Sequence, residues 1–230
     1  MRFCQQARPD VEVHSIHLGF SVAHLVACPR GLLLIDAGLP GCDCRILRAI
    51  EWLRRDDLKW IFVTHAHVDH YGSVAALRRL TDARIAIHAA DAEPMARGET
   101  RLGDIRGRGW LMWALFRLVD PLLRPEPVSA DRCLTDGGQL TGLGCEAVVV
   151  HTPGHTPGSA TLVVGQGERR AFVGDLLSAT GRPHAQCCFA DDWSLIPRSV
   201  TRLQGLGPAW TYTGHNRCPI TARKLADISP

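Results

Sequence analysis

The stretch Thr64-His65-Ala66-His67-Val68-Asp69-His70 is the part of the chain around which the rest is organised. It follows residues 58–63, which are apolar and rich enough in β-branched and aromatic side chains to form a buried strand. It precedes residues 73–80, which have the composition of a helix. Three imidazoles and one carboxylate are therefore expected on a single loop between a strand and a helix.

These four side chains are suited to metal binding. Neutral imidazole and ionised carboxylate are ligands for zinc and other divalent transition metals. His65 and His67 are two positions apart in an extended segment, so they share a face and can reach one ion. Asp69 and His70 follow as the chain turns into the helix, and they can reach a second ion.

The composition is that of an ordinary globular protein of 230 residues, with 46% hydrophobic and 21% charged residues. The net charge of +3 is too small to indicate nucleic-acid binding, and no nucleic-acid partner is expected. Nine cysteines cannot all pair with one another, and no regular disulfide framework is visible. The first residues lack the apolar core of a signal peptide, which favours a cytoplasmic protein. No apolar run reaches the roughly 18–20 residues of a membrane span, so no transmembrane segment is expected.

Further residues of ligand type lie at the ends of predicted strands or in a rigid loop. Asp175 follows the strand predicted at residues 170–173, and Asp36 ends the one predicted at residues 31–36. We call residues 64–70 the metal-ligand loop. Asp36 is either a support for this loop or a simple turn residue. Two Pro-Gly pairs fix a rigid loop and place His155 at its exposed bend.

The order of predicted elements suggests two similar halves, each with apolar strands followed by helices. This pattern predicts two mixed sheets packed face to face, helices on the outside and a metal site along one edge. Helices are expected at residues 45–55, 73–80, 199–203 and 220–226. His88 ends a predicted strand and belongs to no ligand spacing, so it is interpreted as structural.

A single domain is expected over residues 1–230, with an apolar and basic insertion at about residues 98–128. Within it, Trp110–Val119 is apolar on nearly every helical face, and arginines surround it. We weigh an active-site lid, a subunit interface that would make a homodimer through residues 104–120, a membrane-surface helix and a buried core helix. The lid and the interface are favoured.

The ligand set, with its context in Asp36-Ala37-Gly38 and Thr213-Gly214-His215, resembles the metallo-β-lactamase superfamily over essentially the whole chain. The resemblance implies an α+β protein with a four-layer αββα sandwich, in which two mixed sheets are flanked by helices. It also implies a metal-ligand set. The first metal would take His65, His67 and His155, the second would take Asp69, His70 and His215, and Asp175 would bridge the two.

Asp175 makes the resemblance stronger to the glyoxalase II, lactonase and ribonuclease-Z-type branch than to true β-lactamases. The chain departs from glyoxalase II because too little of it follows His215 for a glutathione-binding helical domain. It departs from quorum-sensing lactonases because Leu176, Leu177 and Ser178 stand where those enzymes carry a tyrosine.

The predicted function follows from this ligand set. Two divalent ions about 3.5–4 Å apart can share a hydroxide that attacks an ester, thioester or lactone carbonyl. Zinc is the expected metal, with iron or manganese as alternatives. Asp69 is the candidate catalytic residue, because it could carry a proton to the leaving group. The expected substrate is a small apolar or amphipathic molecule.

Two other enzyme classes stay open as alternatives. A metal-dependent phosphodiesterase or nuclease would use the same metals, but the scattered arginines do not clearly form a basic groove. A mononuclear iron dioxygenase of the persulfide type would use fewer ligands, and the intact second set argues against it.

Overall fold

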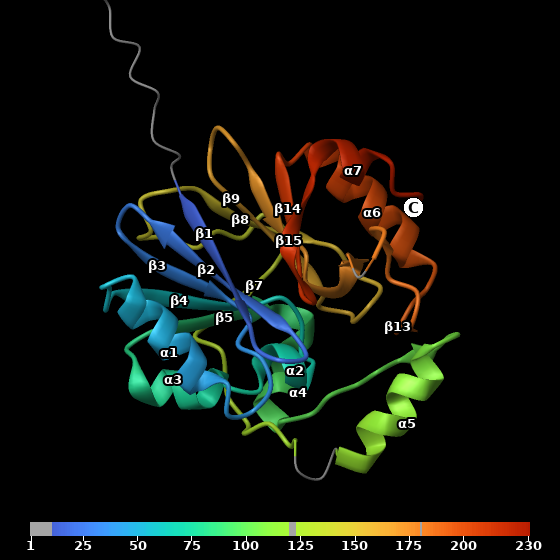
Figure 1. Ribbon diagram of the computed structural model, residues 1–230, viewed down its shortest axis with the longest axis horizontal. Helices are drawn as coiled ribbons and strands as arrows, with labels where there is room; N and C mark the ends of the chain where they lie inside the picture. The colour runs from blue at the N-terminus through green and yellow to red at the C-terminus, as the bar shows by residue number, and fades with distance from the viewer. Residues whose placement is uncertain (1–10, 120–122, 180) are drawn as a thin grey trace, which may run out of the picture.

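Two mixed β-sheets lie face to face in the computed structural model, which describes residues 11–119, 123–179 and 181–230 (Figure 1). The six-stranded sheet has the order β1-β2-β3-β4-β5-β7, with strands Glu12–His17, Val22–Cys28, Gly31–Ile35, Leu58–Val63, Arg84–His88 and Arg132–Leu134. The five-stranded sheet has the order β15-β14-β10-β9-β8, with strands Asn216–Thr221, Trp210–Thr213, Arg170–Phe172, Ala160–Val164 and Ala147–His151. Both sheets combine parallel and antiparallel pairs.

Helices cover the outer face of each sheet (Figure 1). Helices α1 (Asp43–Trp52) and α3 (Val74–Leu80) lie outside the six-stranded sheet, and α6 (Leu195–Leu206) and α7 (Ala222–Ala226) lie outside the five-stranded sheet. The layers are therefore helix, sheet, sheet and helix, and the predicted αββα sandwich is confirmed.

Strand β3 shows why the sequence folds in this way. Leu32 and Leu34 point into the core between the six-stranded sheet and its helices, whereas Leu33 and Ile35 point into the core between the two sheets. Both faces of the strand are buried, so its sequence is a continuous apolar run rather than an alternating one. The parallel neighbour β4 is buried in the same way, and both strands end at the edge that carries the metal-ligand loop.

Several predicted helix boundaries are wrong. Helix α1 spans Asp43–Trp52 rather than residues 45–55, and α6 and α7 also begin at other residues than predicted. Ile220 and Thr221 belong to strand β15, because Thr221 pairs with Trp210, and α7 begins only at Ala222. Thr221 then caps α7 by accepting a hydrogen bond from Lys224 N. Helix α6 begins at Leu195, four residues before the predicted start. Pro197 does not break it, because the first turn of a helix tolerates proline.

Helix α5 (Gly109–Val119) lies outside the four layers (Figure 1). Its first residues, Trp110, Leu111 and Met112, are exposed, so the alternative of a buried core helix is wrong for this part of the segment. Residues 120–122 of the predicted insertion lie outside the described residues. None of the helices in the described ranges has the length and apolar character needed to cross a bilayer.

Candidate metal centre

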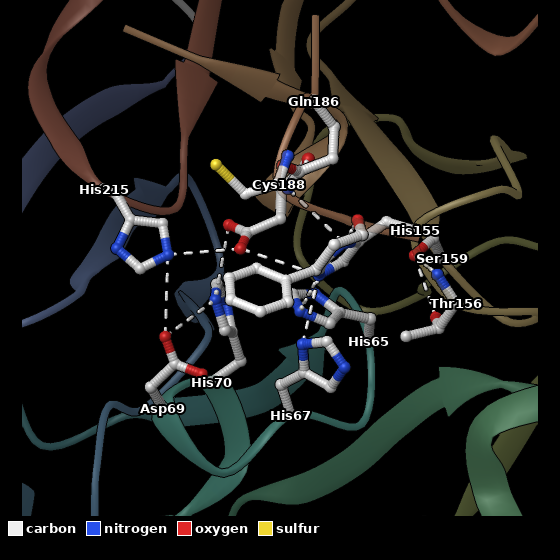
Figure 2. A network of polar contacts seen from close by, with 12 residues as sticks. His65, His67, Asp69, His70, His155, Thr156, Ser159, Gln186, Cys188 and His215 are labelled. Carbon is white, nitrogen blue, oxygen red and sulfur yellow. Dashed lines mark hydrogen bonds and ion pairs between the residues drawn. The ribbon is translucent and has the colours of Figure 1, made fainter. Parts of the chain in front are cut away.

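The metal-ligand loop lies at the edge where the strands of both sheets end. It follows β4 and leads into the short helix α2 (Val68–Tyr71). His65, His67 and His70 are each less than 5% exposed. Figure 2 shows these side chains pointing toward His155 and His215, which come from loops of the second half of the chain.

Three imidazoles form what we call the first cluster: His65, His67 and His155. His155 Nε2 lies 3.2 Å from His65 Nε2 and 3.0 Å from His67 Nδ1. One nitrogen of each ring therefore faces a common point. Burial, followed by the positive charge of neighbouring imidazoles, lowers the pKa of His65 well below its usual value, and burial lowers the pKa of His155 to about 4. His65 and His155 can therefore serve as neutral donors. His155 is 1% exposed, so the expectation that it lies at an exposed bend is wrong.

Asp69, His70 and His215 form the second cluster, in which one ligand atom from each residue lies within 4.8 Å of the others. His70 Nε2 and His215 Nε2 each lie 3.5 Å from Asp69 Oδ2. This cluster combines a carboxylate with two imidazoles.

Asp175 contacts both clusters. It lies in the short 3₁₀ turn Gly174–Leu176 that follows β10. Its Oδ1 is 3.4 Å from His70 Nε2, and its Oδ2 is 3.1 Å from His215 Nε2 and 3.6 Å from His155 Nε2. The structure therefore brings together all seven residues that the resemblance implied as ligands, with Asp175 between the clusters.

Each of the five histidines directs its other ring nitrogen toward an oxygen that can accept a hydrogen bond. The acceptors are Thr64 Oγ1 for His65, Arg101 O for His67, Asp36 Oδ2 for His70, Phe189 O for His155 and Phe20 O for His215, at 2.6–3.0 Å. A carbonyl or carboxylate only accepts, and Thr64 Oγ1 gives its own proton to Asp36, so the outward nitrogen of each ring carries a proton. In the neutral form of each ring, the nitrogen facing the clusters is left with a free lone pair, as a metal ligand requires.

Electrostatics distinguishes the second cluster from the first. Burial lowers the pKa of His70, but the charges of Asp69, Asp36 and Asp175 outweigh it and hold that pKa well above its usual value. Burial is likewise outweighed at His215, where Asp175 raises the pKa to about 9. Burial would raise the pKa of Asp175, but His215 and His70 hold it well below its usual range. The second cluster is therefore organised by opposite charges.

Two buried atoms at this centre lack a hydrogen bond within the described part of the chain. They are His70 Nε2 and Asp175 Oδ1, which are 3.4 Å apart. Buried polar atoms are normally satisfied, so this pair calls for a further partner. A divalent cation fits, since the surrounding atoms are nitrogen and carboxylate donors of the kind that zinc binds.

Asp36 supports the metal-ligand loop, which settles the alternatives left open for it. It directly follows β3 and adopts a φ of 58°, a conformation that aspartate tolerates better than most residues. Its carboxylate accepts hydrogen bonds from Thr64 N, Thr64 Oγ1 and His70 Nδ1, each at 2.8–3.1 Å. Asp36 thereby fixes both the start of the loop and the ring of His70.

Asp91 has a comparable role that the sequence did not reveal. It lies in the first turn of α4 (Ala89–Arg97), is 1% exposed, and accepts hydrogen bonds from Ala66 N, Thr156 Oγ1 and Gly158 N. It therefore joins the metal-ligand loop to the loop that carries His155. The available signal was a carboxylate just after a buried strand, as for Asp36, but its partners are 25 to 67 residues away.

His88 lies outside both clusters, in keeping with its interpretation as structural. Its ring stacks on that of His151, with centroids 4.0 Å apart and planes 8° apart. Among the described residues, the candidate metal clusters contain no cysteine.

The comparisons with known proteins agree with this geometry. The chain is 32% identical over 161 residues to a probable metallo-hydrolase of Burkholderia pseudomallei, with 66% of this chain and 49% of that protein covered. It is 25% identical over 222 residues to the probable metallo-hydrolase YflN of Bacillus subtilis, with 86% and 79% covered. It is also 31% identical over 201 residues to a hydroxyacylglutathione hydrolase of Anaeromyxobacter dehalogenans, with 84% and 62% covered.

The chain thus spans about half the length of the Burkholderia relative. The crystal structure of the BLEG-1 B3 metallo-β-lactamase superimposes with a TM-score of 0.73 at 25% identity, covering 95% of this chain and 98% of that one. The profile described as the metallo-β-lactamase superfamily matches residues 18–215, a range that includes both donor clusters and the strands that position them. The fold, the order of the ligand-type residues and this match agree, and the chain belongs to the metallo-β-lactamase superfamily.

Proposed function

We propose that this protein is a dinuclear metal-dependent hydrolase that cleaves an ester, thioester or lactone with water. The observation that carries the proposal is the position of Asp175, whose two oxygens lie 3.1–3.6 Å from nitrogens of both donor clusters. A carboxylate in that position can hold two ions close together. The family alone does not decide the reaction, because one fold supports many chemistries.

The seven residues would be divided between two ions. His65, His67 and His155 would hold the first, Asp69, His70 and His215 would hold the second, and Asp175 would contribute to both. When bound, two divalent ions supply Lewis-acid polarisation of the carbonyl and lower the pKa of water toward ~7. Zinc suits these nitrogen and carboxylate donors, and iron and manganese are the alternatives.

The chain's own groups orient these donors and move the proton. The acceptors behind the five histidines fix the orientation of each ring, and His70 and His215, whose pKa values are raised, would release a proton when a metal binds. We assign proton transfer to Asp69, whose Oδ2 lies at the second cluster and whose side chain keeps 12% of its surface exposed. That position allows it to take a proton from the attacking water and deliver it to the leaving group.

A thioester is the form of the substrate to test first. The Anaeromyxobacter relative is named a hydroxyacylglutathione hydrolase, a name that describes a thioester as the substrate of that protein. We propose by that similarity that this chain cleaves a thioester bond. Assays with a panel of substrates would identify the groups on either side of the bond.

The test is a panel of ester, thioester and lactone substrates, together with the phosphodiester bis-nitrophenyl phosphate, assayed with Asp175→Ala and with Asp192→Ala. Asp175→Ala should lower metal content and hydrolysis together, because the removed carboxylate faces both clusters. Asp192→Ala removes an exposed carboxylate that belongs to neither donor cluster, so this variant should retain both its metal content and its hydrolytic activity. Unchanged turnover in Asp175→Ala, or activity confined to the phosphodiester, would contradict the proposal.

A further inference from the structure

Helix α5 carries three consecutive large apolar side chains that are exposed. Elsewhere on the described surface, exposed large apolar side chains are isolated in the sequence. Trp110 is 57% exposed, Leu111 67% and Met112 40%, and these three residues are consecutive. Consecutive helical residues are about 100° apart around the axis, so more than one face of the helix carries apolar surface. A helix of this kind needs a covering partner, because water solvates it poorly.

The basic charge of the chain is concentrated around the same helix. Residues 97–124 contain six arginines and three acidic residues, whereas the rest of the chain contains 20 basic and 20 acidic residues. The whole formal net charge of +3 therefore belongs to this segment. All six basic residues are arginine, whose planar guanidinium binds phosphate in a bidentate manner.

These arginines lie on both sides of α5. Arg106 and Arg108 precede the helix and are exposed, and Arg106 lies 4.3 Å over the ring of Trp193. Arg97, Arg101 and Arg124 line a cavity of about 740 Å³ between the helix and the body of the protein. Glu99 is the acidic residue among the described residues of that lining, and Trp113 of α5 forms part of the wall. Arg97 pairs with Glu93 and Glu99, and Arg101 pairs with Glu99, which leaves Arg106, Arg108 and Arg124 as the arginines of this group without an ion pair among the described residues.

The start of α5 is tied to the candidate metal centre. The short strand β6 (Asp104–Ile105) pairs with β13 (Phe189–Ala190), and Arg106 N donates a hydrogen bond to Cys188 O. Phe189 O in turn accepts the hydrogen bond from His155 Nδ1. The segment that leads into α5 is therefore connected to the first cluster through β13, and Figure 2 places Cys188 beside the ligand-type side chains.

We propose that α5 and the arginines around it form a surface that binds an anionic lipid membrane. In this arrangement Trp110 and Leu111 enter the headgroup region, and the arginines contact lipid phosphates. Charge complementarity favours this occupant, because an apolar helix flanked by cations matches a surface that is apolar inside and anionic outside. A tryptophan pair, with the rings of Trp110 and Trp113 centred 5.7 Å apart, suits the boundary between lipid and water.

A second copy of the chain is a less suitable occupant, because it would bring a like-charged arginine cluster against this one. A nucleic acid would match the charge but not the exposed Trp110, Leu111 and Met112. Both are outcomes that the experiment distinguishes. If the proposed hydrolase activity is correct, the surface would present the site to amphipathic substrates, but lipid binding itself can be measured without turnover.

The experiment measures cosedimentation of the full chain with vesicles of phosphatidylcholine alone and of phosphatidylcholine with phosphatidylglycerol. Binding is expected to the anionic vesicles and to weaken as salt is raised. Leu111→Glu should lower the partition coefficient at least about tenfold, because it places a charge on the inserted face. Leu80→Glu is the matched control, since Leu80 is 59% exposed on α3 on another part of the surface, and it should bind as the wild type does.

The arginines are tested in the same way with Arg108→Glu, against Arg48→Glu on α1 as the control. Loss of one basic contact corresponds to about fivefold in partitioning. The proposal is overturned if the wild type does not bind anionic vesicles, or if Leu111→Glu binds as tightly as Leu80→Glu. It is also overturned if light scattering shows a dimer that Leu111→Glu dissociates without any vesicle binding, or if the arginine variants affect binding only to an oligonucleotide.

Discussion

The two donor clusters lie side by side but are built in different ways. The first consists of three buried histidines, held by neutral oxygens at their outward nitrogens. The second contains Asp69 beside two histidines whose pKa values are raised, and His215 keeps 26% of its side-chain surface exposed. The first site is therefore organised by hydrogen bonds from buried rings to neutral oxygens. The second is organised by attraction between a carboxylate and two histidines, and it is partly open to solvent.

The largest effects should come from removing one histidine of each cluster. His155→Ala deletes the nitrogen shared by the two short contacts of the first cluster, so metal content and turnover should both fall, turnover by at least about 1000-fold. His215→Ala should lose the second ion and keep the first. Elemental analysis together with kinetics checks both variants, and loss of both ions in either variant would show that the clusters are not separate sites.

A smaller effect is expected from the carboxylates that support the clusters. Asp36→Asn replaces an acceptor behind His70 and should weaken the second site by about 10- to 100-fold in metal affinity. Asp91→Asn should act on the first site instead, because Asp91 holds the loops of Ala66 and Thr156. Competition with a chromophoric chelator measures the two affinities, and the comparison fails if both variants weaken the same site.

Gly214→Ala tests the close approach of backbone to the second cluster. An added Cβ would lie 2.5 Å from His70 Cε1 and 2.6 Å from Asp175 Oδ1, so these side chains must shift. Turnover should fall about tenfold or more, since small displacements at a catalytic site are costly. Gly205→Ala is the control, because its Cβ meets nothing within 4 Å. Equal turnover in both variants would mean that the site adapts freely.

A separate effect, on stability rather than on activity, concerns His24, which supports the segment before His215 through a contact of 3.1 Å between its Nε2 and Thr213 O. Burial lowers the pKa of His24 to about 4. In the unfolded chain His24 has an ordinary histidine pKa near 6.5. Between pH 4 and pH 6.5, the unfolded chain therefore binds more protons at this residue than the folded protein does. The free energy of unfolding should therefore fall as pH drops from 6.5 to 4, by up to about 3 kcal/mol from this residue.

Urea unfolding of metal-free protein measures that dependence. His24→Gln, which keeps a donor toward Thr213 O, should show a shallower fall in the free energy of unfolding over this range. His17→Gln changes an exposed histidine and should follow the wild type. Parallel curves for wild type and His24→Gln would exclude the buried neutral state of His24.

The layers and the four ligand-type residues of one loop could be predicted because both depend on local patterns, whereas His155, Asp175 and His215 were implied as ligands by the family resemblance. His65, His67, Asp69 and His70 share one loop, and apolar runs such as β3 mark buried strands directly. The supports behind the histidines could not be predicted in the same way. Arg101, Phe189 and Phe20 contribute backbone carbonyls, and a carbonyl leaves no mark on the identity of its residue.

Element boundaries and α5 were less predictable because tertiary pairing decides them. Ile220 is helix-compatible in sequence, but the pairing of β14 and β15 places it in a strand. For Trp110–Val119 the apolar pattern alone could not separate burial from exposure. The structure shows that this part of the segment is exposed, because α5 lies outside the four layers and Leu111 is 67% exposed.

The central claim is that the two clusters hold two ions bridged by Asp175, and metal stoichiometry tests it most directly. Protein purified without added metal should be analysed for all divalent metals and for protein concentration on the same sample. Two divalent ions per chain, reduced in Asp175→Ala, is the predicted result. One iron per chain, with the second cluster unfilled even after metal addition, would contradict the account.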